Sequence, residues 1–108
     1  MSRVTLLAGG VGGARMARGL ARVLGPDELT VIVNVGDDDV IHGALVSADL
    51  DTVVYTRAGI EGPHGWGIAD DTFATMDRLA ALGEDTTFRL GDRDLATCLA
   101  RSIALGRG

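Results

Sequence analysis

The chain has 108 residues, of which 46% are hydrophobic and only 4% aromatic, and its formal net charge at pH 7 is −5. This length fits one domain or part of one, with a core built from Leu, Val, Ile and Ala. All ten basic residues are arginine, and the fifteen acidic residues outnumber them. The basic footprint of a duplex-binding protein is therefore absent, and we expect no nucleic-acid partner.

Cysteine content and hydropathy indicate the compartment. A single cysteine, Cys98, excludes an internal disulfide and a zinc site built from cysteines, and it favours a reducing, cytoplasmic setting. No apolar run of 18 residues occurs, and no charged segment followed by an apolar one resembles a signal peptide. We therefore expect a cytoplasmic protein that does not interact with membranes.

The stretch RVTLLAGGVGGAR organises the N-terminal half. It predicts a short buried strand over residues 4–8, a glycine loop, and a helix from about Ala14 to Leu24. A strand that leads through glycines into a helix leaves backbone N–H groups unpaired at the positive end of the helix dipole, which is a site for an anion. We therefore predict that a phosphate-bearing ligand contacts Gly10, Val11, Gly12 and Gly13.

The spacing of the glycines does not identify which nucleotide would bind. The third glycine of a dinucleotide fingerprint would fall at Arg15, and the chain has no lysine to complete a P-loop. The alternative is a tight turn that packs the helix on the sheet. Arg15 favours the phosphate interpretation, because a guanidinium one turn into the helix can reach a phosphate held at its start.

A second strand, expected over residues 29–35, is rich in β-branched residues and predicts a parallel strand buried on both faces. It is followed by three carboxylates, Asp37, Asp38 and Asp39, on the side of an α/β sheet where ligands bind. Close carboxylates repel one another unless a cation neutralises them, and Mg²⁺ prefers oxygen ligands. The alternative is a turn in which one aspartate caps the next helix.

The stretch VSADLDT supplies further acidic candidates. In an extended chain Asp49 and Asp51 would face the same side as a metal-ligand pair, although Asp51 could equally cap a helix or strand. We interpret His42, just upstream, as a loop histidine rather than a ligand.

The C-terminal half of the sequence has fewer motifs that indicate a ligand-binding site. Trp66 stands between two glycines, so it either stacks on a planar ligand or anchors a small satellite core. A helix with an acidic first turn is expected from about residue 68 to Gly83, and a short strand near Phe88 precedes a last helix. The GDRD turn either pairs its own charges at the surface or presents Arg93 to a phosphate and Asp92 or Asp94 to a ribose or base.

These elements predict a Rossmann-like three-layer α/β/α fold with a mainly parallel sheet, forming a single domain over residues 1–108. So few strands would leave apolar faces uncovered. We therefore expect either a homodimer or the N-terminal part of a longer fold.

Five motifs in register carry a family resemblance: GGVGGAR, VNVGDDD, HG with DLDT, GWGIADDTF and RLGDRDLAT. In this order they resemble the 2-phospho-L-lactate transferase family of coenzyme F-420 biosynthesis, and the lysine-free composition is similar to its actinobacterial phosphoenolpyruvate transferase branch. The resemblance covers the whole chain but only about the first third of a typical member. The chain departs from the family pattern at Ala48, where a proline is usual, and at Cys98, where a histidine is usual.

The resemblance implies a magnesium-dependent transfer of a phospholactyl or enolpyruvyl-phosphate group. The donor is linked to guanosine diphosphate, the acceptor is the deazaflavin 7,8-didemethyl-8-hydroxy-5-deazariboflavin, and GMP is released. Carried over by position, Asp37, Asp38 and Asp51 would hold Mg²⁺ and serve catalysis. The glycine loop with Arg15, together with Asp92 and Arg93, would bind the nucleotide. The alternatives are a nicotinamide-binding oxidoreductase domain, with Asp37 on the ribose, and a non-catalytic nucleotide-binding fragment.

Overall fold

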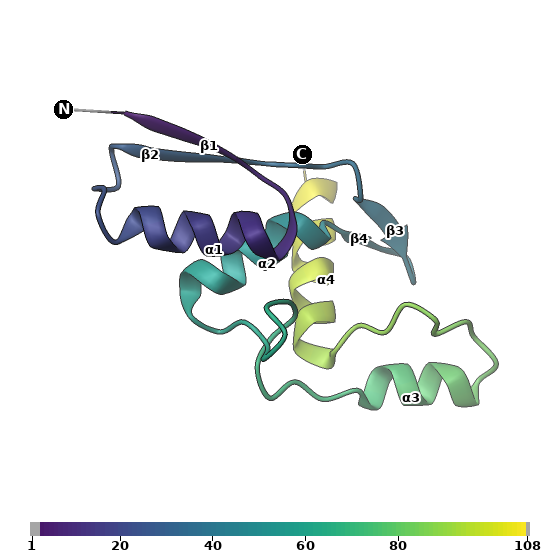
Figure 1. Ribbon diagram of the computed structural model, residues 1–108. Coiled ribbons are helices and arrows are strands. Elements are labelled where there is room, and N and C mark those ends of the chain that lie inside the picture. The colour runs from purple at the N-terminus through teal and green to yellow at the C-terminus, as the bar shows by residue number, and fades with distance from the viewer. Residues whose placement is uncertain (1–2, 108) are drawn as a thin grey trace.

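The computed structural model describes residues 3–107 as an elongated α/β arrangement measuring 55 × 34 × 20 Å (Figure 1). Two parallel strands and their connecting helix lie at one end, the helix over residues 74–81 lies at the other, and the last helix runs between them. In chain order the elements are β1 (Val4–Ala8), α1 (Gly10–Ala21), β2 (Leu29–Val33), β3 (Asp39–Ile41), β4 (Ala44–Val46), α2 (Ala48–Ala58), α3 (Ala74–Ala81) and α4 (Asp92–Gly106).

The predicted strand–helix–strand unit is present. Strand β1 pairs with β2 in parallel, from Val4 opposite Leu29 to Ala8 opposite Val33, and α1 makes the crossover. Strands β3 and β4 instead form a separate antiparallel hairpin, which the sequence analysis did not predict. Over residues 3–107 the protein is thus a small α/β structure with one short parallel pair, and a full Rossmann sheet is not seen.

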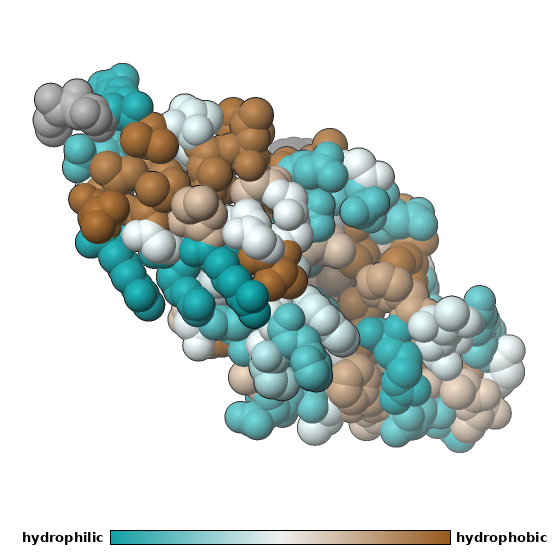
Figure 2. Space-filling view, in the orientation of Figure 1, coloured by the Kyte–Doolittle hydropathy of each residue, from teal (hydrophilic) through white to brown (hydrophobic). Residues whose placement is uncertain are grey.

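One face of the parallel pair is covered and the other is bare. Helices α1 and α2 pack on the covered face, where Ala8, Ala14, Ala17 and Val53 form a core. On the other face Leu7 is 76% exposed and Ile32 is 54% exposed, so the expectation of a strand buried on both sides is wrong. No helix in the described chain covers that face, and Figure 2 shows hydrophobic side chains gathered over this end of the molecule.

Helix α1 begins at Gly10, four residues earlier than predicted, because the glycines continue into the helix instead of forming a longer loop. Gly13 is the position that demands glycine: a Cβ there would lie 2.8 Å from the Cβ of Ala8. The glycines thus serve close packing of α1 on β1 as well as the turn itself.

The second core joins the β3–β4 hairpin to α3 and α4. Its buried members are Ala44, Val46, Met76, Leu90 and Cys98. Helix α3 begins later than predicted because Asp70, with φ 58°, has a left-handed conformation that a helix cannot continue through. The expected strand near Phe88 is absent from the described structure, where that segment is irregular and leads directly into α4. Within residues 3–107, no helix combines the length and the apolar character needed to cross a bilayer.

Candidate functional site

The start of α1 leaves its backbone open to a ligand. Gly9 precedes the helix in an extended conformation, and no side chain caps the first turn. A Cβ added at Gly12 would meet no atom within 4 Å, so this side of the turn faces open space. Unpaired N–H groups at a helix start form an anion site, which fits the predicted role of Gly10, Val11, Gly12 and Gly13.

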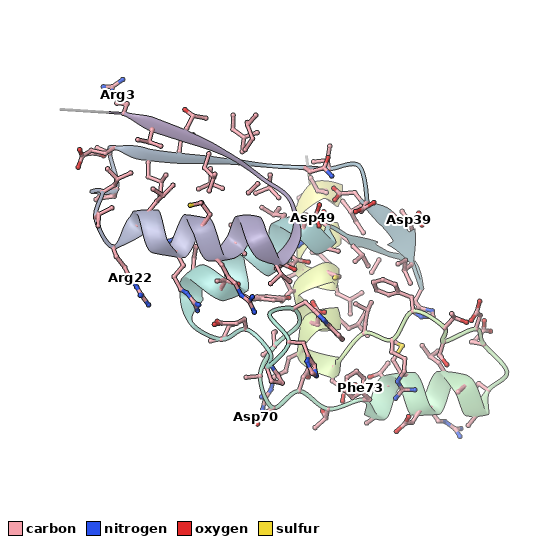
Figure 3. All side chains as sticks on the ribbon, viewed as in Figure 1. Arg3, Arg22, Asp39, Asp49, Asp70 and Phe73 are labelled. Atoms are coloured by element: carbon pink, nitrogen blue, oxygen red, sulfur yellow. The ribbon has the colours of Figure 1, made fainter. Side chains whose placement is uncertain are left out.

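An acidic side chain, Asp49, lies beside this turn at the start of α2 (Figure 3). A Cβ on Gly9 would lie 3.6 Å from Asp49 Oδ2, and Asn34 Nδ2, just after β2, donates a hydrogen bond of 3.3 Å to the same oxygen. The ends of β1 and β2 and the start of α2 therefore converge at the glycine turn, as expected for the ligand side of an α/β unit.

Arg15 occupies the second turn of α1 because the helix begins at Gly10. Its guanidinium lies beside the loop that follows α2: a Cβ on Gly65 would be 3.4 Å from Arg15 Nη2 and 2.6 Å from Val11 Cγ1. The loop that carries Trp66 is thus packed against the first two turns of α1.

The second part of the candidate site is a buried acidic cluster between α2 and α4. One ligand atom each from Asp51, Asp94 and Cys98 lies within 4.8 Å of the others. Arg101 forms an ion pair with Asp51, and Tyr55 donates a 2.7 Å hydrogen bond to Asp94 Oδ1. Asp51 is only 5% exposed, so its charge is almost completely removed from water.

Burial dominates the electrostatics of this cluster. Loss of hydration raises the pKa of Asp51, against the opposing effect of Arg101, and it also raises the pKa of Asp94. Each carboxylate has a further negative charge nearby: Asp94 and Asp38 act on Asp51, and Asp71 acts on Asp94. Burial also raises the pKa of the Cys98 thiol to about 11, so the sulfur is protonated at neutral pH.

Asp37 and Asp38, which follow β2, have different environments. Asp38 turns towards the cluster, because its Oδ2 accepts a 2.9 Å hydrogen bond from Ser47 Oγ and its charge is felt at Asp51. Asp37 lies exposed in the turn. The argument that Asp49 and Asp51 face the same side is wrong, because both lie in a helix: Asp49 borders the glycine turn and Asp51 faces α4.

Asp92 caps a helix in this structure. Its carboxylate accepts hydrogen bonds from Thr72 Oγ1 at 2.6 Å and from the backbone N–H groups of Ala74 and Thr75 at the start of α3. The neighbouring Arg93 is exposed and places Nη1 3.5 Å from the carbonyl oxygen of Asp70. Of the acidic residues of the GDRD turn, Asp94 is the one that reaches the buried cluster.

A largely apolar cavity of about 480 Å³ adjoins the cluster. Trp66, Phe88 and Leu90 contribute to its walls, and Asp51 and Asp94 also line it. Trp66 is 58% exposed, which favours the planar-ligand interpretation over that of a core anchor. A smaller adjoining cavity of about 250 Å³ shares Trp66, Arg89 and Asp94 with the first.

The sequence analysis missed Arg101 of the cluster as a site residue. It named Asp49 and Asp94 as candidates, but for other roles: Asp49 as a metal-ligand partner of Asp51, and Asp94 as a contact to a ribose or base. Nothing in the sequence pointed to Arg101, which pairs with a residue 50 positions earlier. His42 lies in the β3–β4 turn with φ 53°, consistent with the loop role expected of it.

The donor set fits a hard divalent cation. Asp51, Asp94 and the nearby Asp38 supply carboxylate oxygens, and burial, which raises the pKa of Asp51 and Asp94 despite the nearby Arg101, means that an added cation would favour their charged forms. The protonated Cys98 sulfur is a poor ligand for Mg²⁺.

Comparison with known proteins identifies the family. A family model described as 2-phospho-L-lactate transferase CofD matches residues 4–107. The chain belongs to the CofD family. This membership confirms the resemblance drawn from the five motifs.

Curated CofD-family relatives are similar along nearly the whole chain. The phosphoenolpyruvate transferase of Streptomyces avermitilis is 50% identical over 108 residues, covering 98% of this chain and 34% of the relative. Those of Thermobifida fusca and Mycobacterium leprae are 47% and 46% identical, with 98% of this chain and 36% and 37% of the relatives covered. The chain thus spans about a third of the length of these relatives.

Proposed function

We propose that this chain carries the nucleotide turn and acidic cluster of a CofD-family transferase. The reaction moves a phospholactyl or enolpyruvyl-phosphate group from a guanosine-diphosphate-linked donor to the deazaflavin, and releases GMP. The observation that carries the proposal is that the first turn of α2 borders both halves of the site: Asp49 lies at the glycine turn, and Asp51 lines the cavity.

The donor would bind at the start of α1. The open N–H groups from Gly10 to Gly13 suit a diphosphate, and the absence of a Cβ at Gly12 lets it approach the backbone. Arg15 and Arg93, both exposed, are the proposed cationic partners for the nucleotide. Asp92 is already occupied as a helix cap, which makes it the weakest of the proposed nucleotide contacts.

The acceptor would bind in the larger cavity. A planar deazaflavin ring suits a space walled by Trp66 and Phe88, and its hydroxylated side chain would extend towards Asp51 and Asp94. This arrangement would direct the terminal hydroxyl of the acceptor to the end of the cavity where the carboxylates lie.

In the proposed step, the acceptor hydroxyl oxygen attacks the donor phosphorus that carries the lactyl or enolpyruvyl group. A new P–O bond forms, the bond from phosphorus to the oxygen bridging to GMP breaks, and GMP leaves with that oxygen. The hydroxyl proton passes to a nearby carboxylate of the acidic cluster. The glycine-turn N–H groups stabilise the charge that develops on the phosphates.

Asp51 and Asp38, with Asp94, would hold Mg²⁺, and Asp37 at the surface is a further proposed ligand. When bound, the ion would neutralise the diphosphate and lower the pKa of the attacking hydroxyl.

Calorimetry of GDP and of NAD, each with and without Mg²⁺, tests this function against the oxidoreductase alternative. We expect GDP to bind in the presence of Mg²⁺, and Gly12→Ala to weaken it by about tenfold without loss of stability, because the new methyl would occupy open space at the turn. Magnesium-independent binding of NAD without binding of GDP would contradict the proposal. Release of GMP from donor and deazaflavin then distinguishes an active chain from a binding fragment.

A further inference from the structure

Arg101 connects three elements of the acidic cluster. From α4 it pairs through Nη2 with Asp51 Oδ1 on α2, and through Nη1 it donates a 3.0 Å hydrogen bond to the carbonyl oxygen of Leu45 on β4. The exposed fraction of the side chain is 17% for Arg101 and 7% for Asp51, so the pair is largely shielded from solvent.

The other oxygen of Asp51 has a different environment. Asp51 Oδ2 accepts a 3.9 Å hydrogen bond from the Cys98 thiol, and one ligand atom each from Asp51, Cys98 and Asp94 lies within 4.8 Å of the others. Arg101 therefore occupies one oxygen of Asp51, and the second has only the weak thiol donor of Cys98, with Asp94 close by.

We propose that Arg101 is the positioning residue of the acidic site: by bonding Asp51 Oδ1 and the Leu45 carbonyl with one guanidinium, it orients Asp51 Oδ2 towards a divalent cation shared with Asp94. This inference rests on the proposed function, and it adds to it a residue that no family motif in the sequence singled out. Residues that hydrogen-bond to a metal ligand and so fix its orientation typically raise the metal affinity by about 10- to 100-fold.

The geometry requires arginine rather than any cation. A guanidinium is planar and presents several N–H groups in a fixed arrangement, so one side chain can bond to a carboxylate and a carbonyl at once. A lysine at this position keeps the charge but presents a single ammonium group on a flexible stem. Arg101→Lys therefore removes the orientation of Asp51 and preserves the local charge.

Ser102 provides a matched control. Its Oγ accepts a 2.9 Å hydrogen bond from the backbone N–H of Leu45 and donates one to the carbonyl oxygen of Cys98. Ser102 thus attaches the same strand to the same helix, and it makes no hydrogen bond to Asp51 among those of the described residues. Ser102→Ala therefore measures the effect of weakening the attachment of β4 to α4 while the Arg101–Asp51 pair is kept.

The experiment measures Mn²⁺ affinity by electron paramagnetic resonance, with Mg²⁺ as competitor, on the complete chain and on both variants. Thermal unfolding is recorded in parallel. We expect Arg101→Lys to weaken Mn²⁺ binding by about tenfold, and Ser102→Ala to change it by less than about twofold. Unchanged affinity in Arg101→Lys would overturn the inference and leave the proposed cation site intact. An equal loss in both variants would also overturn it, because attachment of the strand would then explain the effect.

The proposed function fails in a different way. If the unmodified chain binds no Mn²⁺, or binds it equally well after Asp51→Asn, the cation site itself is refuted and the inference with it.

A second measurement on the unmodified chain does not depend on how the variants fold. Mg²⁺ titration followed by nitrogen-detected magnetic resonance should shift the side-chain signal of Arg101 and leave that of Arg22, at the end of α1, unchanged. A shift at the Asp51 backbone amide without one at the Arg101 side chain would overturn the inference.

Discussion

Asp71 and Asp92 cap each other's helices. The Asp71 carboxylate, before α3, accepts hydrogen bonds of 2.9 and 3.1 Å from the backbone N–H groups of Arg93 and Asp94 in the first turn of α4. Asp92, the first residue of α4, accepts hydrogen bonds from the first turn of α3. This exchange fixes the start of α4, and with it the position of Asp94 in the candidate site. Gly91 is required beside it, because a Cβ there would collide with the Asp71 carboxylate.

Removal of either cap should loosen both helices. We expect Asp71→Ala to lower the free energy of unfolding by about 1 kcal/mol, the usual value of a helix cap, and Asp92→Ala to lower the melting temperature as well. Urea and thermal unfolding followed by circular dichroism measure these effects. Asp77→Ala is the control: its ion pair with Arg89 is exposed, and its loss should change stability by less than about 0.5 kcal/mol.

The Asp92 cap also predicts a dependence on pH. Hydrogen bonds from Thr72 and Thr75 lower the pKa of Asp92 in the folded state. Its contribution to stability is therefore present above the ordinary pKa of aspartate and is lost as the pH falls through the lowered folded value. Asp92→Asn should make unfolding less sensitive to acid in that range. An unchanged acid profile would show that the cap does not contribute.

Asp51 and Asp94 should affect the pH dependence of stability in the direction opposite to that of Asp92. Because burial raises the pKa of both, the folded state holds more protons than the unfolded state just above the ordinary pKa of aspartate. The free energy of unfolding should therefore decrease as the pH rises from the unfolded to the folded pKa values. Asp94→Asn should make this decrease shallower in urea titrations carried out just above the ordinary pKa of aspartate.

Neighbouring glycines of α1 should respond differently to the same substitution. Gly13→Ala should cost about 1–3 kcal/mol, because the new methyl would overlap Ala8 on β1. Gly12→Ala should be neutral, or stabilising by up to about 1 kcal/mol, because its Cβ has open space and alanine favours the helix. Urea unfolding measures both. Equal costs at the two positions would contradict the packing of α1 on β1 described above.

The buried thiol of Cys98 should be unreactive in the folded protein. A pKa of about 11, against an ordinary value of 9.0, lowers the thiolate fraction at pH 8 by about 100-fold, and burial blocks access as well. Iodoacetamide should label Cys98 at least about 100 times faster in urea than in buffer. Rapid labelling of the native chain would show that α4 opens locally.

The bare face of the parallel pair allows a test of the homodimer, which was one of the two alternatives expected from the sequence. Because Leu7 and Ile32 are exposed, Leu7→Ser and Ile32→Ser should cost less than about 0.5 kcal/mol in the monomer. If this face joins two copies, sedimentation velocity of the unmodified chain should show a dimer that the double variant abolishes. A dimer unaffected by both substitutions would exclude the face as its interface.

Local patterns were enough to predict several parts of this protein. Apolar runs and glycine punctuation located β1, α1 and β2, because strand and helix periods depend on neighbouring residues. The same patterns missed the β3–β4 hairpin, whose strands have only three residues each. They also placed a helix across Asp70, whose backbone conformation ends any such helix.

The sequence by itself determined the family, the strand–helix–strand unit and the acidic character of the site, because each is encoded in contiguous residues. Only the tertiary structure decided which carboxylates lie close together. Asp94 and Arg101 reach Asp51 because α4 packs against α2 and β4, across 43 and 50 positions of sequence. The same packing directs Asp49 and Asp51 to different halves of the site, and no local pattern reports how two helices meet.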